Sequence, residues 1–309
     1  MAIVTVRELL EAGVHFGHQV SRKNPKMEPY IYGKRNLIHI IDLRSTIRGM
    51  LQAVHFLRRL SANGEQILFV GTKRQAKNVV REEAKRCRMH YVCERWLGGT
   101  LTNYSTIRSR LSRLEELEKM EADGSIDLYS KKMQASLQRE KRKIKRNLEG
   151  IRRMVKLPDC MLIVDPRREI NAVREARKLE KPIIAVLDTD CDPSLVDISI
   201  PANDDSMRSI QVILARLTDA IVEGRSEFES TRAAEAKVEP PVVEAPPPPA
   251  PVAAAPAAPA APTTVASSAP PKKDTAAYKY EAGLPTPSQQ RQQLNTKSSW
   301  SSDEPEDEE

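Results

Sequence analysis

Three aspartates and one histidine have the residue types and spacing that could support metal chemistry. Asp188 follows the apolar run Ile183–Leu187, and Asp204 and Asp205 come a few residues after a second strand pattern. Because the carboxyl ends of strands in an open α/β sheet line one crevice, these three carboxylates are expected to converge. Repulsion between them would raise their pKa values unless a cation lay among them. Together with the imidazole of His18, the set predicts a candidate zinc site.

Local hydrogen bonding is a competing explanation for the same aspartates. Asp204 or Asp205 could cap the helix that is predicted to begin at Ser206, and Asp188 could accept hydrogen bonds from loop amides. His18 reaches the crevice only if the N-terminal segment folds back over the sheet. Since position in a fold does not by itself make a site, the sequence favours capping and keeps zinc as the alternative.

The motifs of nucleotide-binding and hydrolytic enzymes are missing from the chain. No G-x-G-x-x-G follows a strand pattern, and neither a P-loop nor a G-x-S-x-G elbow occurs. The nearest match runs from Phe69 to Lys73, where a single glycine is too little backbone to surround a phosphate. Thr72 in that run is better explained as a helix cap. We therefore expect a protein that is not an enzyme.

Basic side chains alternate with aromatic ones near the N-terminus. Tyr30 and Tyr32 stand among cations in the stretch 15–36. Cations spaced among flat side chains suit contacts with phosphate and stacking on bases or sugars, although both tyrosines could instead pack on the edge of a sheet. The candidate RNA-binding residues of this stretch are Arg22, Lys23, Lys26, Lys34 and Arg35.

Positive charge is concentrated again further along the chain. Residues 131–156 hold 11 lysines and arginines against 2 acidic residues. Such a surplus repels itself unless an anion neutralises it, which favours a nucleic-acid partner over a merely solvated helix face. The remaining candidates for RNA binding are Lys73, Arg74, Lys77, Arg95, Arg108, Arg139, Lys141, Arg142, Lys143, Lys145 and Arg146.

The elements that must position these side chains alternate between strand and helix. Runs such as Ile67–Val70 are apolar on successive residues, which is typical of strands buried on both faces of a parallel sheet. With right-handed crossovers, this order predicts a doubly wound, mostly parallel, flavodoxin-like α/β sheet built from residues 1–102 and 156–224. The expected strands are 37–43, 66–70, 90–92, 160–165, 182–187 and 197–200, and the expected helices are 45–60, 74–86, 168–179 and 206–223.

Residues 103–155 interrupt the alternation. They contain no strand pattern, and their apolar residues recur at the spacing of a coiled coil on both sides of a turn at Gly124. We expect an inserted antiparallel helical hairpin with coiled-coil packing. Its apolar seam would be formed by Ile107, Leu111, Leu114 and Leu117 in the first arm and by Leu137, Ile144, Leu148, Ile151 and Val155 in the second.

Composition changes beyond Gly224. Of the 22 prolines, 15 lie in residues 240–309, and the chain ends in the acidic run 303–309. Such a segment cannot bury enough apolar surface to offset its ordering entropy. Residues 225–309 are therefore predicted to form a disordered, Pro/Ala-rich tail with an acidic end. Without this tail the body carries a net charge of +12.

The chain shows the features of a cytoplasmic protein. It has no run of 18 apolar residues, and charged side chains interrupt its first 11 residues, where a signal peptide needs an apolar stretch. Its four cysteines form no C-x-x-C pair and no metal-ligand spacing. Secreted, membrane and disulfide-stabilised classes are therefore excluded.

Several stretches of the body resemble one known family. They are 9–18, 24–27, 38–43, 69–73, 95–103, 157–159, 188–193 and 200–204, and they occur in order over residues 1–224. These stretches are similar to the bacterial small-subunit ribosomal protein S-two (uS-two) family. Two features depart from the family pattern: position 190 is Asp where the family often has Asn, and the Pro/Ala tail has no counterpart.

The resemblance implies a structural constituent of the small ribosomal subunit that takes part in translation. It implies contacts with small-subunit ribosomal RNA and with neighbouring ribosomal proteins, including docking of the large multi-OB-fold protein that captures messenger RNA. The alternatives are a flavodoxin-like enzyme that modifies nucleotides or RNA, and an RNA-binding adaptor outside the ribosome. Cosedimentation with the small subunit would separate the adaptor from the ribosomal protein.

Overall fold

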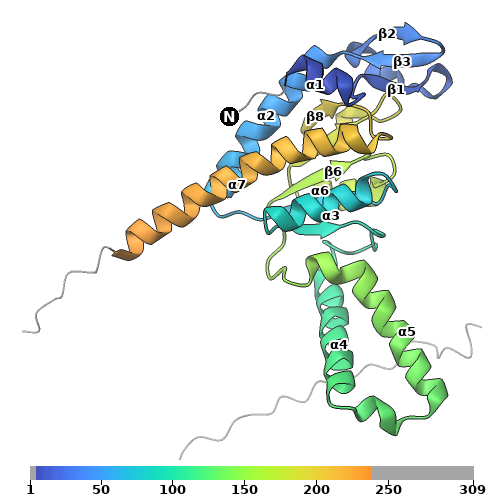
Figure 1. The fold of residues 1–309 in the computed structure, drawn as a ribbon, viewed down its shortest axis with the longest axis vertical. Helices are drawn as coiled ribbons and strands as arrows, with labels where there is room; N and C mark the ends of the chain where they lie inside the picture. The colour runs from blue at the N-terminus through green and yellow to red at the C-terminus, as the bar shows by residue number, and fades with distance from the viewer. Residues whose placement is uncertain (1–4, 238–309) are drawn as a thin grey trace, which may run out of the picture. The chain divides into compact units, whose positions relative to one another are not determined.

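The computed structural model describes residues 5–237, and its centre is a parallel sheet (Figure 1). Each neighbouring pair of strands in this sheet is parallel, in the order β5-β4-β6-β7-β8. This is the flavodoxin-like strand order, so the predicted fold class is confirmed. The strands are β4 (Ile67–Val70), β5 (His90–Val92), β6 (Cys160–Val164), β7 (Ile183–Leu187) and β8 (Ile198–Pro201).

Helices cover both faces of the parallel sheet. Side chains of β4 alternate between the two cores: Ile67 and Phe69 pack with α2 (Leu43–Ala62), α3 (Ala76–Arg86) and α7 (Met207–Lys237), whereas Leu68 and Val70 pack with α6 (Ile170–Lys178). All four residues of β4 are fully buried. Burial on both faces is the reason for the unbroken apolar runs in the sequence.

The N-terminal segment forms a second sheet that the sequence did not predict. Its strands β1 (Phe16–Gln19), β2 (Ile31–Arg35) and β3 (Ile38–Ile41) are antiparallel, in the order β1-β3-β2. The prediction that 37–43 is a strand of the parallel sheet was wrong. Burial of β3 alternates instead, with Ile38 exposed and His39 and Ile41 buried, as expected for an antiparallel strand with one solvated face.

Two short elements complete the N-terminal segment. The helix α1 (Val6–Glu11) begins with a capping box, in which the side chains of Thr5 and Glu8 each accept a hydrogen bond from the other residue's backbone N–H. Between β1 and β2 the chain forms the 3-10 turns η1 (Val20–Arg22) and η2 (Pro25–Tyr30). The 3-10 turn η5 (Pro193–Leu195) precedes β8.

Helices α4 (Tyr104–Ala122) and α5 (Lys131–Leu148) form a hairpin that projects from the parallel sheet (Figure 1). The turn between them passes through Gly124, whose φ of 69° suits glycine, and the 3-10 turn η3 (Ser125–Leu128). Leu111, Leu114 and Leu117 of α4 are buried, and a 3-10 turn η4 (Glu149–Ile151) returns the chain towards the sheet. Coiled-coil packing between α4 and α5 stays a prediction, but the placement of Val155 in its apolar seam was wrong, because this residue lies beyond α5 and is 70% exposed.

Helix α7 continues to Lys237, so the expected end of the body at Gly224 was wrong. Gly224 serves packing: a Cβ there would overlap the carbonyl oxygen of Arg58 on α2. Four residues later the ring of Phe228 packs against Gly64, and Glu227 pairs with Arg58. The rest of the predicted disordered tail, residues 238–309, lies outside the described residues. No helix within 5–237 is long and apolar enough to cross a membrane.

Candidate functional site

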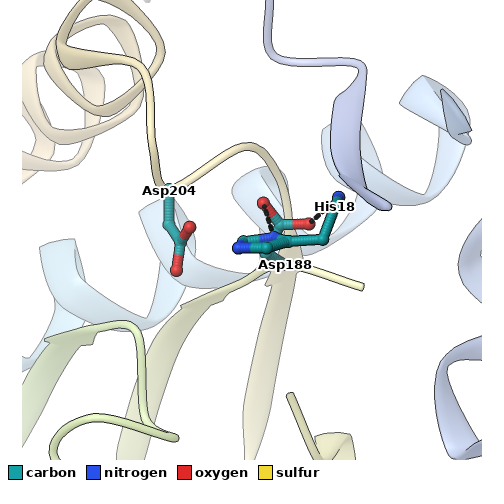
Figure 2. Close-up of side chains that lie close together, drawn as sticks. All are labelled: His18, Asp188 and Asp204. Carbon is teal, nitrogen blue, oxygen red and sulfur yellow. Dashed lines mark hydrogen bonds and ion pairs between the residues drawn. The ribbon is translucent and has the colours of Figure 1, made fainter. Parts of the chain in front are cut away.

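The carboxyl ends of the parallel strands bring the predicted metal residues together. Asp188 follows β7, Asp204 follows β8, and the N-terminal sheet carries His18 over this edge (Figure 2). The Nδ1 atom of His18 lies 3.0 Å from Asp188 and its Nε2 atom lies 3.4 Å from Asp205. His18, Asp188 and Asp204 offer ligand atoms that all lie within 4.8 Å of one another. One nitrogen and several carboxylate oxygens suit zinc or a similar divalent ion.

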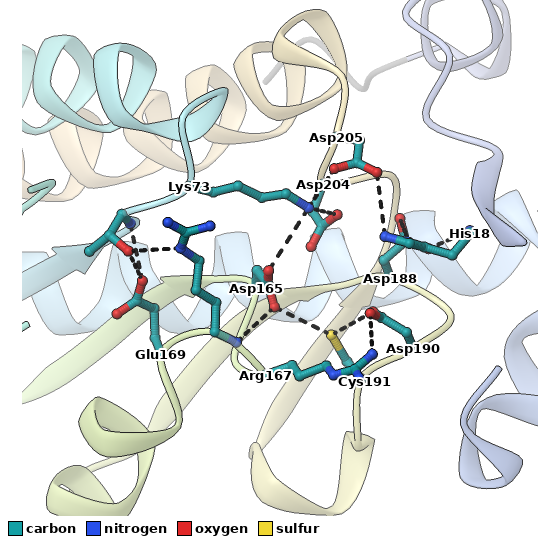
Figure 3. A network of polar contacts seen from close by, with 12 residues as sticks. His18, Lys73, Asp165, Arg167, Glu169, Asp188, Asp190, Cys191, Asp204 and Asp205 are labelled. Carbon is teal, nitrogen blue, oxygen red and sulfur yellow. Dashed lines mark hydrogen bonds and ion pairs between the residues drawn. The ribbon is translucent and has the colours of Figure 1, made fainter. Parts of the chain in front are cut away.

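Lys73 supplies a cation within the same cluster (Figure 3). Its ammonium lies 2.6 Å from both Asp204 and Asp205 and 3.9 Å from Asp165. The sequence predicted that Lys73 binds RNA, but its side chain is only 12% exposed and is held among carboxylates. Lys73 is therefore not counted among the cations that are free to bind a phosphate.

The charges in the cluster shift one another's pKa values. The hydrogen bond to Asp188 raises the pKa of His18 to about 9, against the opposing effect of burial. Burial, together with repulsion from Asp188 and Asp165, raises the pKa of Asp204 to about 8. Burial acts against the charge of Lys73, but attraction to Asp204 outweighs it and raises the pKa of the lysine. The protonation state of each group in the cluster therefore depends on the charges of its neighbours.

The predicted hydrogen bonds from loop amides to Asp188 are present, but the prediction that Asp204 or Asp205 caps the last helix was wrong. Asp188 accepts hydrogen bonds from the backbone N–H groups of His18, at 3.2 Å, and Thr189, at 2.5 Å. The cap of α7 is Ser206, whose hydroxyl accepts the backbone N–H of Ser209 at 3.4 Å, and the side chain of Asn203 accepts the N–H groups of Asp205 and Ser206 in the turn before it. The second carboxylate oxygen of Asp204 is buried with no hydrogen-bond partner within residues 5–237. An unpartnered buried acceptor is costly unless a cation or proton occupies it.

Asp165 belongs to this cluster, although it was not among the predicted metal ligands. It follows β6 directly, as Asp188 follows β7, so the same strand-end rule could have found it. Its φ of 61° is left-handed, which is unusual for a residue other than glycine. Asp165, Cys191 and Asp204 form a second group of atoms within metal-ligand reach of one another.

The predicted RNA-binding residues fall into two classes. Three of them pair with carboxylates: Lys26 with Asp192 at 2.7 Å, Lys77 with Glu94 at 2.5 Å, and Lys145 with Glu118 at 4.0 Å. Lys23 and Lys141 are paired as well, with Glu28 and Glu121. The exposed candidates that take part in no ion pair within the described part of the chain are Arg22, Lys34, Arg35, Arg74, Arg95, Arg108, Arg139, Arg142, Lys143 and Arg146.

Four of these free cations share one face of α5. Arg139, Arg142, Lys143 and Arg146 are spaced by three, one and three residues, and all four are exposed. Side chains three and four residues apart lie on the same side of a helix. The half-buried and buried residues Leu137, Ile144 and Leu148 lie on the opposite side. The hairpin therefore presents a row of positive charge to solvent.

A half-buried carboxylate fixes the loop that leads into the hairpin. Glu175 of α6 accepts hydrogen bonds from the indole of Trp96, at 2.9 Å, and from the backbone N–H groups of Gly99, Leu101 and Thr102, at 2.8–3.2 Å. Burial would raise the pKa of Glu175, but these hydrogen bonds outweigh it and lower the pKa. No sequence signal marked Glu175, because its partners lie more than 70 positions away.

Comparison with known proteins gives consistent similarities. A family model described as ribosomal protein S2 matches residues 9–224. The chain is 55% identical over 240 residues to the small ribosomal subunit protein uS2 of Rhodopirellula baltica, covering 78% of this chain and 92% of that protein. It is 53% identical over 229 residues to the small ribosomal subunit protein uS2c of Emiliania huxleyi, covering 74% of this chain and all of that protein.

Proposed function

The chain belongs to the ribosomal protein S2 family, whose members are structural constituents of the small ribosomal subunit, and we propose that it binds small-subunit ribosomal RNA through its free cations. The family is one of ribosomal structural proteins and not of enzymes. Neither the flavodoxin-like enzyme nor the adaptor outside the ribosome is therefore needed to explain the positive charge.

The observation that carries the proposal is the row of cations on α5. Arg139 and Arg146 are separated by seven residues, which corresponds to about 10 Å along a helix. Neither they nor the two cations between them are neutralised by a carboxylate within residues 5–237. Phosphates of an RNA backbone would neutralise these charges and release counterions, which gives affinity with little base specificity.

Binding of the full-length chain to a transcript of the small-subunit RNA, measured over a range of salt concentrations, tests this proposal. We expect affinity to fall steeply with salt, and the slope to decrease when Arg139, Arg142, Lys143 and Arg146 are replaced by Gln. The control replaces Arg177 and Lys178 by Gln, two exposed cations at the end of α6 that take part in no ion pair within 5–237. Because it loses two cations and the α5 variant loses four, the change in slope is compared per cation removed. Equal slopes for both variants and the wild type would refute the role of α5.

The partners follow from the family relationship. We propose that neighbouring small-subunit proteins contact the chain, and that it helps to dock the large multi-OB-fold protein that captures messenger RNA. Exposed apolar side chains on α1, Val6 at 50% and Leu10 at 47%, offer a contact surface for a protein. Subunits assembled with Val6→Asp and Leu10→Asp should then lose that protein while they keep this chain.

Four free, buried cysteines support a reducing compartment, the cytoplasm.

A metal at the carboxylate cluster is a second proposal. The three ligand groups of His18, Asp188 and Asp204, and the unpartnered oxygen of Asp204, favour a divalent ion such as zinc. Lys73 competes as an internal cation. Elemental analysis of the purified chain should find zinc near one equivalent that is lost in His18→Ala and kept in the control His55→Ala. A metal-free wild type that still binds the subunit would end this proposal.

A further inference from the structure

The tip of the β2–β3 hairpin holds a leucine in a conformation that leucine disfavours. The two strands are joined by Asn36 and Leu37 alone, with φ values of 49° and 63°. Two consecutive left-handed residues define a type I′ turn, in which the second position strongly prefers glycine. A Cβ makes this conformation unfavourable for Leu37, so its presence needs an explanation.

Packing within the chain does not provide that explanation. The side chain of Leu37 is 79% exposed, and its neighbours from Lys34 to Ile38 are exposed as well. The carbonyl of Leu37 accepts a hydrogen bond from the backbone N–H of Val20 at 3.0 Å, which holds the turn in place. The fold thus fixes the strained turn and presents an apolar side chain to solvent. Strain of this kind is typical of binding elements.

Tyr32 is presented in the same way. The pairing register of β2 with β3 shifts between Ile31 and Gly33, so Tyr32 lies in a β-bulge, and it is 81% exposed. Bulges commonly redirect a side chain near a functional site. Tyr30, by contrast, is half-buried against the core, and its hydroxyl lies 3.5 Å from Ser199. Of these two tyrosines, Tyr32 is the one whose ring is free to stack on a partner.

Gly33 is a third feature that the fold itself does not require. Its φ is not in the left-handed region, and a Cβ added to it would meet no atom within 4 Å. Glycine at such a position leaves room for the backbone of this edge strand to approach a ligand closely. Lys34 and Arg35 follow directly, and both are exposed and outside every ion pair within residues 5–237.

We propose that the β2–β3 tip is an RNA-binding element in which Tyr32 stacks on an unpaired base. Lys34 and Arg35 neutralise the adjoining phosphates, and Leu37 packs against the sugar or the edge of the base. A flat ring beside free cations is the combination that single-stranded RNA loops favour. The two free cations at the tip favour RNA over a protein partner. The inference rests on the proposed binding of ribosomal RNA and names a site for it.

Stacking is tested with the full-length chain and a transcript of the small-subunit RNA. Tyr32→Ala should weaken binding at least about fivefold, whereas Tyr32→Phe, which keeps the ring, should bind like the wild type. Tyr32→Ala should leave the salt dependence unchanged, while Lys34→Gln and Arg35→Gln should each lower the slope by about one. Leu51→Ala, which truncates an exposed leucine on α2, is the control and should have no effect.

Leu37→Gly separates a binding role from a structural one. Glycine relieves the strain of the turn, so the melting temperature should not fall, while affinity for the RNA should fall. If Tyr32→Ala and Leu37→Gly bind as the wild type does, the tip is not an RNA-binding element, and the proposed function stands. A wild type that does not bind the transcript overturns both. Subunits that keep the Tyr32→Ala chain but lose a neighbouring protein overturn the choice of RNA as the partner.

Discussion

Replacing Glu175 with Gln is expected to destabilise the entrance to the hairpin. The two oxygens of the carboxylate accept hydrogen bonds from different donors. One accepts from the indole N–H of Trp96 and the backbone N–H of Gly99, and the other accepts from the backbone N–H groups of Leu101 and Thr102. An amide has one oxygen, so its NH2 group would face N–H donors on one side. The variant would therefore lose the charge and leave one set of donors without an acceptor.

The size of the effect follows from the bonds that are lost. Hydrogen bonds to a charged group contribute about 1.5–3 kcal/mol each, and an unsatisfied buried donor costs about 1–3 kcal/mol. Water can replace part of this at the exposed Thr102. We expect the free energy of unfolding to fall by about 2–3 kcal/mol, which corresponds to a melting temperature roughly 5–10 °C lower for a body of this size.

Thermal and urea unfolding of the full-length Glu175→Gln variant, with Glu180→Gln as the exposed control on the same segment, measure this effect. Because the pKa of Glu175 is lowered in the folded chain, its ionised form adds stability above the ordinary pKa of a glutamate. That contribution is lost as the pH falls through the folded pKa, below 4.5. The difference between the wild type and Glu175→Gln should shrink there. Equal stability of the two at neutral pH would refute the reasoning.

Two further predictions concern the packing of the body. A chain that ends at Glu239 should melt like the full-length protein. One that ends at Gly224 should melt at a lower temperature, because it loses the contact of Phe228 with Gly64 and the ion pair of Glu227 with Arg58. Equal melting of the two would show that the end of α7 adds no stability. Gly150→Ala should lower the free energy of unfolding by about 2 kcal/mol or more, because its Cβ would overlap a carbonyl oxygen of β5. Urea unfolding measures this effect. The control Gly98→Ala, with open space around the added Cβ, should unfold like the wild type.

The parallel sheet could be predicted because its strands carry the signal of double-sided burial. Ile67–Val70 and Ile183–Leu187 are apolar on every residue, which only a covered sheet explains. The N-terminal sheet lacked such a signal. In β2, Gly33 and Lys34 are poor strand formers, and a bulge breaks the alternation. The prediction therefore treated residues 15–36 as a basic stretch without strands and assigned the strand at 37–43 to the parallel sheet.

The candidate site could be predicted in part for the same reason. Strand ends of a parallel sheet meet at one edge, so Asp188 and Asp204 could be placed together from sequence alone. The position of Lys73 could not, because its charge suggested solvent and its partner Asp204 lies 131 residues away. Only the folded structure shows that this lysine is held within the carboxylate cluster.

Cosedimentation tests the central claim, that the chain is a small-subunit protein held there by its free cations. The full-length wild type, incubated with small subunits depleted of this protein, should migrate with the subunit through a sucrose gradient at moderate salt. The variant with Gln at Arg142 and Lys143 should dissociate at a lower salt concentration than the Arg177→Gln, Lys178→Gln control, which loses the same number of charges. A wild-type chain that stays at the top of the gradient while the subunits sediment without it would contradict the account.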